Sequence, residues 1–530
     1  PELGPACFNL AMLRIDQSRW DDAVALLQRS LAGNRNHADA HYWLGNALMG
    51  LGDAAGARMA YSAAVNLDNR HLQARWGHVM AQVPAIPLND AEQSQAPTAF
   101  ARELEKLKIW FRASRPTNAY LAVGAQQPYY LAYISRNHRE VLSSYGALCA
   151  ELMAAWGRKA GVPAPVAKGH AKCRVGIVSA HIHSHSVWHA FLRGWIEHLE
   201  PAQFELQLFH TGAVRDAETE WASRRVSKLH HALGHWSNWA KAISDCQLDV
   251  LIYPEIGMDS TTARLAALRL ARVQLAAWGH PMTSGMPTID AFIGAHAFEP
   301  AQGATHYSER LLQLPRLGSV YQAYGTRPSR LDFSTWRVRS TDKVLLCAGT
   351  PYKYAPQHDA LLVEIARRCQ PCKLIFFKDA PQGLAARLEQ RLRAAFALTD
   401  ISFDECVRFV PWQAQSAFFA WLDRADIYLD SIGFSGFNTT MQAIERGTPI
   451  VAFEGEFMRG RFASAILRQI GLDEWVATST EQYVQLVERL ASDKKARALA
   501  GQQIVERRRQ LFDDQVTVTA FSKLLTELCA

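Results

Sequence analysis

A glycine-bearing segment in the last quarter of the chain carries residues suited to holding a phosphate group. Residues 427–429 form a predicted strand, and Gly433 and Gly436 permit tight turns after it. The helix predicted next begins with amide and hydroxyl side chains, those of Asn438, Thr439 and Thr440. Free backbone N–H groups and such side chains at a helix start favour an anion. The competing interpretation is an ordinary turn between a strand and a helix.

A lysine in a second loop could complete this anion site. Lys353 stands three residues after the predicted strand segment KVLLCAGT, so it lies at that strand's carboxyl end. Ligands of parallel sheets bind beyond the carboxyl ends of the strands. Two anion-suited loops in one half of the chain favour a nucleotide, whereas the alternative is a solvent-exposed lysine in an ordinary loop.

The segment VSAHIHSHSVWHAF contains four histidines, which are His181, His183, His185 and His189. Alternate histidines on a strand can bind a metal, but no nearby carboxylate or cysteine completes a ligand set. Imidazole also donates hydrogen bonds to phosphate or substrate oxygens and transfers protons near neutral pH. We favour an active-site histidine, and a metal site and a chance polar loop are the alternatives.

The elements that position these loops are predicted from the alternation of apolar runs with helical segments. Such alternation is typical of parallel sheets with helices on their faces. It occurs in two series, so the fold class is α/β with two Rossmann-like lobes, over residues 171–333 and 334–530, the second with the C-terminal helices. We expect a cleft between the lobes, where the carboxyl ends of the strands lie.

Upstream of the lobes, residues 1–83 show an α-helical tetratricopeptide-repeat pattern with a period of 34 residues. Small residues at Ala23 and Ala57 allow paired helices to pack closely. A proline-bearing break over residues 83–98 opens a helical linker, predicted to span residues 84–170 and to pack on the lobes. The repeats are better suited to recognition or assembly, including homo-oligomer formation, than to chemistry.

Composition excludes several classes of function. A net charge of +7 over 530 residues, with the basic residues spread out, gives no support for nucleic-acid binding. No apolar stretch is long enough to span a membrane and no signal-like segment opens the chain, so a cytoplasmic protein is expected. Nine scattered cysteines favour reduced thiols, and the pair Cys369 and Cys372 lacks the partners of a zinc site.

As an ordered set, these features resemble the O-GlcNAc transferase/SPINDLY-type glycosyltransferases, including the related bacterial adhesin N-glucosyltransferases. Besides the repeats, the resemblance is carried by VSAHIHSHSVWH, QLAAWGHPMTSGMPTIDAFI, HYSERLLQLP, CAGTPYKYAP and the FNTT…ERGTP loop. It implies a GT-B-type pair of lobes, with the acceptor on the first lobe and the UDP-sugar on the second.

The resemblance also implies roles for individual residues. His185 and Lys353 match catalytic positions, and Lys353 would contact the donor diphosphate. The implied nucleotide-sugar-binding residues are Thr350, Lys353, Asn438, Thr439, Thr440 and Gln442. His280 and His183 are candidates for the acceptor side or the cleft. Phe437 and Gln442 stand where relatives carry polar nucleotide contacts, Gln442 at the position of a ribose-binding aspartate.

The implied activity is inverting transfer of GlcNAc or glucose from a UDP-sugar to a protein side chain, in the first place serine or threonine. The polypeptide acceptor would be presented near the repeats. The chain contains no Asp-x-Asp pair, which favours a reaction without a metal or other cofactor. The alternatives are an asparagine-linked glucosyltransferase, a non-catalytic nucleotide-sugar-binding adaptor, and a glycosyltransferase acting on a small molecule or glycan.

Overall fold

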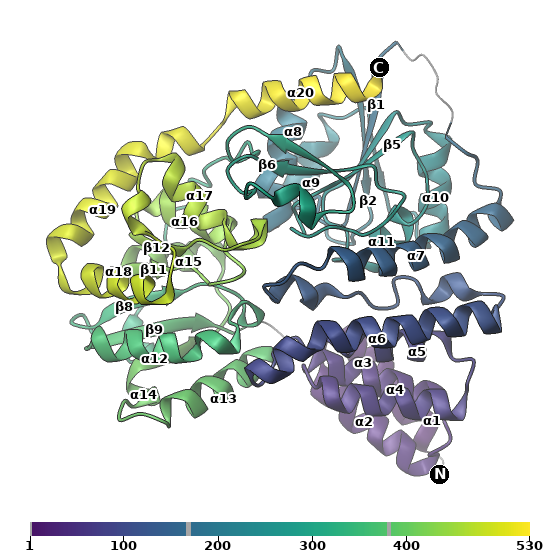
Figure 1. Cartoon of the computed structure of the whole chain (residues 1–530), viewed down its shortest axis with the longest axis horizontal. Coiled ribbons are helices and arrows are strands. Elements are labelled where there is room, and N and C mark those ends of the chain that lie inside the picture. Colours follow the sequence, from purple (N-terminus) through teal and green to yellow (C-terminus); the bar gives the residue numbers. More distant parts are fainter. Residues whose placement is uncertain (1–2, 166–170, 379–382) are drawn as a thin grey trace.

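A computed structural model describes residues 3–165, 171–378 and 383–530 (Figure 1). The repeat region consists of antiparallel helices: α1 (Leu3–Asp16), α2 (Trp20–Gly33), α3 (Ala38–Gly50), α4 (Ala54–Leu67) and α5 (Leu72–Met80). Ala23 and Ala57 are fully buried between them, as the repeat pattern predicts. A Cβ atom on Gly45 would come within 2.5 Å of the Tyr61 ring. Small residues at these points therefore set the close spacing of the helices.

Regular structure in the linker begins before the end of the break that the prolines predicted over residues 83–98. Helix α6 (Asp90–Ser114) starts inside the predicted break and contains Pro97. Its start is fixed because the Asn89 side chain accepts a hydrogen bond from the Glu92 amide at 2.9 Å. The linker then continues through η1 (Ala119–Ala122), η2 (Tyr129–Tyr133) and α7 (Arg139–Ala160). Within the described ranges, no helix combines the length and apolar composition that a membrane crossing requires.

The first lobe is built on a parallel sheet of seven strands in the order β3-β2-β1-β4-β5-β6-β7. The strands are β1 (Cys173–Ser179), β2 (Phe204–His210), β3 (Lys228–His231), β4 (Val250–Tyr253), β5 (Val273–Ala277), β6 (Ala291–Ala295) and β7 (Arg310–Leu314). The helices between them are α8 (Arg193–His198), α9 (Ala217–Ser223), α10 (Trp236–Asp245) and α11 (Ser260–Ala266), with η3 (Trp188–Leu192) and η4 (Gly303–His306). The strand order reverses between β1 and β4, and the histidine segment leaves the sheet at this point.

The second lobe repeats this plan with six parallel strands in the order β10-β9-β8-β11-β12-β13. The strands are β8 (Lys343–Cys347), β9 (Cys372–Phe377), β10 (Val407–Val410), β11 (Ile427–Leu429), β12 (Ile450–Phe453) and β13 (Val476–Ala477). Lys353 follows β8 and the glycine loop follows β11, on either side of the point where the order reverses. The predicted fold class, repeats followed by two Rossmann-like lobes, is confirmed.

Helices and short turns connect the strands of the second lobe. These are η5 (Phe333–Trp336), η6 (Pro351–Lys353), η7 (Pro356–His358), α12 (Asp359–Arg368), α13 (Leu384–Phe396), α14 (Phe403–Cys406), α15 (Gln415–Arg424), α16 (Asn438–Arg446), η8 (Met458–Gly460), α17 (Phe462–Gln469), η9 (Asp473–Trp475), α18 (Thr480–Ser492), α19 (Lys494–Arg507) and η10 (Arg508–Leu511).

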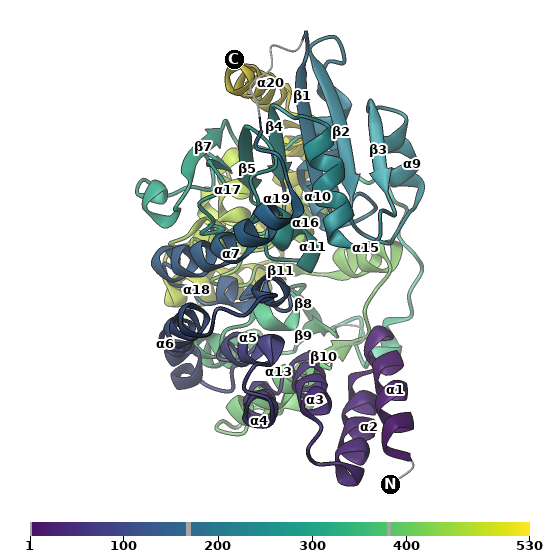
Figure 2. The same cartoon turned by 90° about the vertical axis from the view of Figure 1, so that its right-hand side faces the viewer.

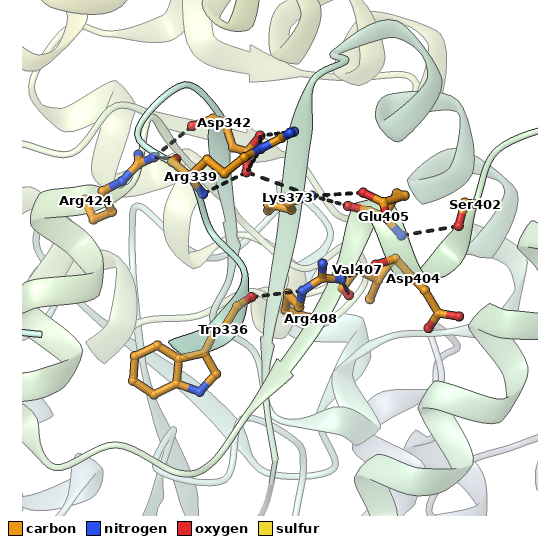
Figure 3. Close-up of polar contacts among 10 residues, drawn as sticks. All are labelled: Trp336, Arg339, Asp342, Lys373, Ser402, Asp404, Glu405, Val407, Arg408 and Arg424. Atoms are coloured by element: carbon orange, nitrogen blue, oxygen red, sulfur yellow. Dashed lines mark hydrogen bonds and ion pairs between the residues drawn. The ribbon is translucent and has the colours of Figure 1, made fainter. Parts of the chain in front are cut away.

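The amino-terminal edge of the second sheet is fixed by buried charge (Figure 3). Lys373 is only 3% exposed, and its ammonium lies 3.9 Å from the carboxylate of Asp342. The same carboxylate pairs with Arg339 at 2.9 Å, and Arg424 donates to the Asp342 carbonyl at 2.8 Å. Asp342 directly precedes β8 and Lys373 lies at the start of β9, so their ion pair joins the starts of the two strands. Loss of either partner would leave the other charge buried and unpaired, which is strongly destabilising.

The last helix does not stay with the second lobe. Helix α20 (Gln515–Cys529) crosses back and lies beside the first sheet (Figure 1). The Phe521 ring stacks on Trp195 at 4.3 Å, and Asp514 pairs with Arg316 at 3.0 Å. Cys529 forms a disulfide with Cys173, so the expectation of reduced thiols is wrong for this pair. The other seven cysteines are free.

The lobes meet through a cluster of aromatic rings at their carboxyl edges. The Phe437 ring lies 4.9 Å from Trp278 and 5.9 Å from Phe298, both of the first lobe. Phe462 of the second lobe lies 4.9 Å from Phe298. All four side chains are at least 90% buried. Phe437 is therefore a packing residue of this lobe interface, not a polar contact site.

Truncation of Phe437 is expected to loosen the contact between the lobes. Phe437→Ala removes a buried ring, which costs about 3 to 5 kcal/mol of stability. The measurement is the midpoint of urea-induced unfolding. Leu398→Ala, at a residue 88% exposed, is the control and should leave the midpoint unchanged. Equal midpoints for the two variants would contradict the importance of this interface.

Candidate functional site

The two loops predicted to bind an anion lie together. Lys353 donates a hydrogen bond to the Ser435 carbonyl at 3.4 Å, which ties the loop after β8 to the glycine loop after β11. Its ammonium also lies 4.8 Å from the centroid of the Phe434 ring. Lys353 thus reaches the glycine loop, and no carboxylate of the described residues forms an ion pair with it, so its positive charge is available to a ligand.

Asp430 is a site residue that sequence reasoning missed. It is buried directly after β11, and its Oδ1 accepts a hydrogen bond from the Gly436 amide at 2.8 Å. Burial raises the pKa of Asp430 to about 6. Burial lowers the pKa of Lys353 to about 8, and the negative charge of Asp430 acts in the opposite direction. A carboxylate right after an apolar strand was the available sequence signal.

The polar side chains at the start of helix α16 make contacts both across the lobe boundary and within the second lobe. The Asn438 amide donates to the Ser186 carbonyl of the histidine segment at 2.7 Å, which joins the two lobes across the site. Its Oδ1 is buried without a hydrogen-bond partner among the described residues. Thr439 bonds to the Tyr428 hydroxyl at 2.7 Å. Thr440 is fully buried and donates to the Gly436 carbonyl at 2.6 Å, so its hydroxyl stabilises the loop instead of facing a ligand.

Thr350 lies in the turn that leads to Lys353. The turn is closed by a hydrogen bond from the Lys353 amide to the Thr350 carbonyl at 2.9 Å. The Thr350 hydroxyl oxygen is buried and has no hydrogen-bond partner among the described residues. An unpaired buried hydroxyl is costly, so this group is suited to a ligand oxygen.

The histidine segment faces this site from the first lobe. The His181 and His185 rings stack at 3.8 Å, and the His183 ring lies 5.6 Å from that of His185. Burial, and then the neighbouring His181, lower the pKa of His185 to about 3. The Val187 amide donates to Nδ1 of His185 at 3.2 Å, so the neutral ring carries its proton on Nε2. His185 is therefore a hydrogen-bond donor at neutral pH.

The histidines do not gather as a metal-ligand set. Across the described residues, three such ligand atoms come within 4.8 Å of one another only at Cys173, Asp249 and Cys529. Two of those residues form the disulfide, and the group lies at the start of β1, away from the histidine segment. His189 instead contacts the Tyr324 ring at 4.6 Å.

A second buried carboxylate lies beneath the histidine segment. Glu255 follows β4 at the point where the first sheet reverses its order, and it accepts hydrogen bonds from the Ser179 hydroxyl at 2.6 Å and the Ala180 amide at 3.1 Å. Burial raises the pKa of Glu255 to about 8. Glu255 was not predicted from the sequence, and its place soon after the apolar strand β4 was the available signal.

Two of the predicted positions contact other parts of the chain. His280 is buried, and its ring stacks on that of Tyr129 from the linker at 5.2 Å. Burial and the charge of Arg459 lower the pKa of His280 to about 4. Burial raises the pKa of Tyr324 to about 12, against hydrogen bonds that include one with Gln442. Gln442 thus contacts the segment that connects the lobes.

Family comparisons agree with this architecture. Residues 8–71 match the tetratricopeptide repeat model, and residues 383–520 match the model of glycosyl transferase family 41. The structure superposes on Thermobaculum terrenum O-GlcNAc transferase with a TM-score of 0.72 and 20% identity, over 100% of this chain and 92% of that one. At this identity the superposition shows a shared fold.

Sequence relatives carry the names of protein glycosyltransferases. One is the probable UDP-N-acetylglucosamine--peptide N-acetylglucosaminyltransferase SEC of Arabidopsis thaliana, 24% identical over 67% of this chain and 37% of that protein. SPINDLY of Solanum lycopersicum is 24% identical over 60% of this chain and 34% of its own length. The UDP-glucose:protein N-beta-glucosyltransferase of Actinobacillus pleuropneumoniae serotype 7 is 23% identical over 48% of this chain and 40% of its own.

The chain therefore spans 34% to 40% of the length of these relatives. The matches confirm the resemblance predicted from the ordered motifs, for the repeats and for the two lobes.

Asp430→Asn is expected to lower the pKa of Lys353 below its value of about 8, because the carboxylate no longer stabilises the ammonium. The pKa is measured by NMR titration of the lysine side-chain carbon next to the amine. Asp404→Asn, which removes a carboxylate with a 71% exposed side chain on α14, is the matched control. An unchanged or higher pKa in Asp430→Asn would show that the two charges are not coupled.

Proposed function

We propose that this chain is a UDP-sugar-dependent protein glycosyltransferase that transfers GlcNAc or glucose to a protein side chain, with inversion and without a metal. The observation that supports it best is the contact between the loops that leave each sheet where its strand order reverses. Lys353 reaches the glycine loop, and Asn438 at the start of α16 bonds to the segment that carries His185. A cationic group, a helix start and a neutral imidazole thus surround one place between the lobes.

In this proposal the second lobe holds the donor diphosphate. The Lys353 ammonium offsets the charge that develops as UDP leaves, and the free N–H groups at the start of α16 add to it. Oδ1 of Asn438 and the Thr350 hydroxyl oxygen, which have no hydrogen-bond partner in the described part of the chain, accept hydrogen bonds from donor hydroxyl groups. Because these groups are fixed by the fold before the donor arrives, little reorganisation is needed during the reaction.

The first lobe then orients the reacting groups. His185 donates a hydrogen bond from Nε2 to an oxygen of the donor or acceptor, and its lowered pKa keeps it neutral. An acceptor oxygen attacks the anomeric carbon from the face opposite UDP, which inverts that carbon. The bond from the anomeric carbon to UDP breaks as the new C–O bond forms, and the proton of the acceptor hydroxyl passes to an oxygen of the departing diphosphate, since Nε2 of His185 already carries a hydrogen.

Serine or threonine is the proposed acceptor, presented by a polypeptide bound near the repeats. The names of the SEC and SPINDLY relatives specify a peptide acceptor without naming its residue, and serine or threonine is the residue that the resemblance of the ordered motifs implies. Asparagine is the second candidate, because a UDP-glucose:protein N-beta-glucosyltransferase is also similar to this chain. Mass spectrometry of modified proteins co-expressed with the enzyme distinguishes the two linkages.

A nucleotide-sugar-binding adaptor is a further candidate function. It is favoured by two residues that take structural contacts in place of nucleotide contacts: Phe437 packs between the lobes and Gln442 contacts Tyr324. Such an adaptor would bind UDP-sugars and show neither transfer nor hydrolysis.

A panel of UDP-sugars is expected to include a donor that the protein hydrolyses or transfers. Lys353→Ala should lower turnover of that donor by about 100-fold to 1000-fold, because a preorganised charge at the leaving group is lost. Circular dichroism checks that the fold is intact. Lys241→Ala, at a surface lysine paired with Asp245, is the control. Near-normal turnover by Lys353→Ala would refute the assigned role.

The affinity for UDP is expected to fall as the pH rises through about 8. The pKa of Lys353 is lowered to about 8, so the binding ammonium is present below that pH and lost above it. Apparent affinity should then decrease by up to about tenfold per pH unit. Calorimetry from pH 6.5 to 9.5 measures this, and Lys353→Arg should remove the decrease because guanidinium stays charged. A constant wild-type affinity across the range would contradict the proposal.

A further inference from the structure

One face of helix α13 contacts both the repeat region and the loop that carries Lys353. Leu384, Arg387 and Arg391 lie on this face at helical spacing. Arg387 donates to the Leu51 carbonyl at 3.2 Å and lies 3.6 Å from Asp53, in the turn between α3 and α4. Figure 2 shows α13 beside the repeat helices, below the strands of the second lobe. The repeats are therefore seated directly on the second lobe.

Arg391 is the buried centre of this contact. It is 6% exposed, and its guanidinium pairs with both carboxylate oxygens of Asp359 at 2.7 and 3.1 Å. It also donates to the Pro87 carbonyl of the linker at 3.0 Å and to the Tyr354 carbonyl. One planar cation thus joins α12, the linker and the residue that follows Lys353.

The turn around Lys353 depends on this anchor. The Tyr354 hydroxyl accepts a hydrogen bond from the Gly349 amide at 3.0 Å, so Tyr354 closes the turn at its other end. Ala85 and Ile86 of the linker pack on Leu384 and on Tyr352, the residue before Lys353. The linker and Arg391 therefore hold the residues on both sides of Lys353.

We propose that Arg391 is a positioning residue that sets the Lys353 turn and couples its geometry to the seating of the linker against the second lobe. The effect on catalysis rests on the proposed function, whereas the effect on the position of the Lys353 turn rests on the contacts alone. A polypeptide bound to the repeats could shift the linker. Such a shift would change the position of Lys353 through the contacts of Arg391 and Ile86. The coupling would link acceptor binding to donor affinity.

Hydrogen–deuterium exchange of the amides of residues 349–354 tests the structural part without any ligand. These amides include hydrogen-bonded groups of the Lys353 turn, so a loosened turn exchanges faster. Arg391→Met should raise their exchange at least about tenfold, whereas Arg393→Met, on another face of α13, should not. Arg393 pairs with Glu389 and Asp404 and makes none of the contacts above. Equal exchange in the two variants would overturn the proposal.

A second pair of variants perturbs the linker instead of the helix. Ile86 is 1% exposed in the contact with Leu384 and Tyr352, whereas Leu88, two residues away, is 48% exposed. Ile86→Ala should raise exchange at residues 349–354, and Leu88→Ala should leave it unchanged. Exchange that stays at the wild-type level in Ile86→Ala would disprove the coupling. Because Ile86 carries no charge, this pair also decides the question if Arg391→Met fails to fold.

Steady-state kinetics with the UDP-sugar identified by the panel test the catalytic part. A misplaced Lys353 turn should raise the donor KM of Arg391→Met about tenfold, and Arg391→Lys, which keeps a charge beside Asp359, should recover part of the loss. A merely structural role would lower apparent kcat with the folded fraction and leave KM unchanged, which would overturn the proposal. If no UDP-sugar binds the wild type, the proposed function fails, and the exchange data still decide the positioning role.

Discussion

The apolar contact around Phe437 fixes how the two lobes face each other, and the site depends on that placement. Its partners Trp278 and Phe298 follow strands β5 and β6, so the rings meet at the carboxyl edges of both sheets. Asn438 follows Phe437 directly and donates its hydrogen bond to the Ser186 carbonyl across the lobe boundary. Packing of one residue therefore places the next beside the histidine segment, because an apolar contact of this kind is dense and shape-specific.

Around this junction the fold keeps charges where water is scarce. Burial lowers the pKa of Lys353 to about 8 and raises that of Asp430 to about 6. Both groups are therefore charged near neutral pH, although burial disfavours the charged form of each. An anionic ligand would stabilise the ammonium further. Because burial disfavours the charged form of Lys353, the position of the lysine turn is important. The contacts of Tyr354 with Arg391 and with Gly349 hold that turn in place.

Several parts of the fold and the site could be predicted from sequence. The repeats, the two parallel sheets, and the loops of Lys353 and Asn438 follow from local periodicity and from the rule that ligands bind at carboxyl edges. Other contacts could not be predicted, because they join parts of the chain that are far apart in sequence. The His280 ring stacks on Tyr129 of the linker, and α20 packs beside the first sheet. Asp430 and Glu255 were passed over because burial, which sequence spacing does not report, is what perturbs them.

By itself the sequence determined the order of the elements, the residue types at each switch point and the resemblance to a glycosyltransferase family, since these depend on patterns within short segments. Only the tertiary structure decided which of those residues meet. It placed Phe437 in the lobe interface and brought Arg391 to the carbonyl of Tyr354, 37 residues away. The physical reason is that packing and buried hydrogen bonds join residues far apart in the chain, and their partners are chosen by the whole fold.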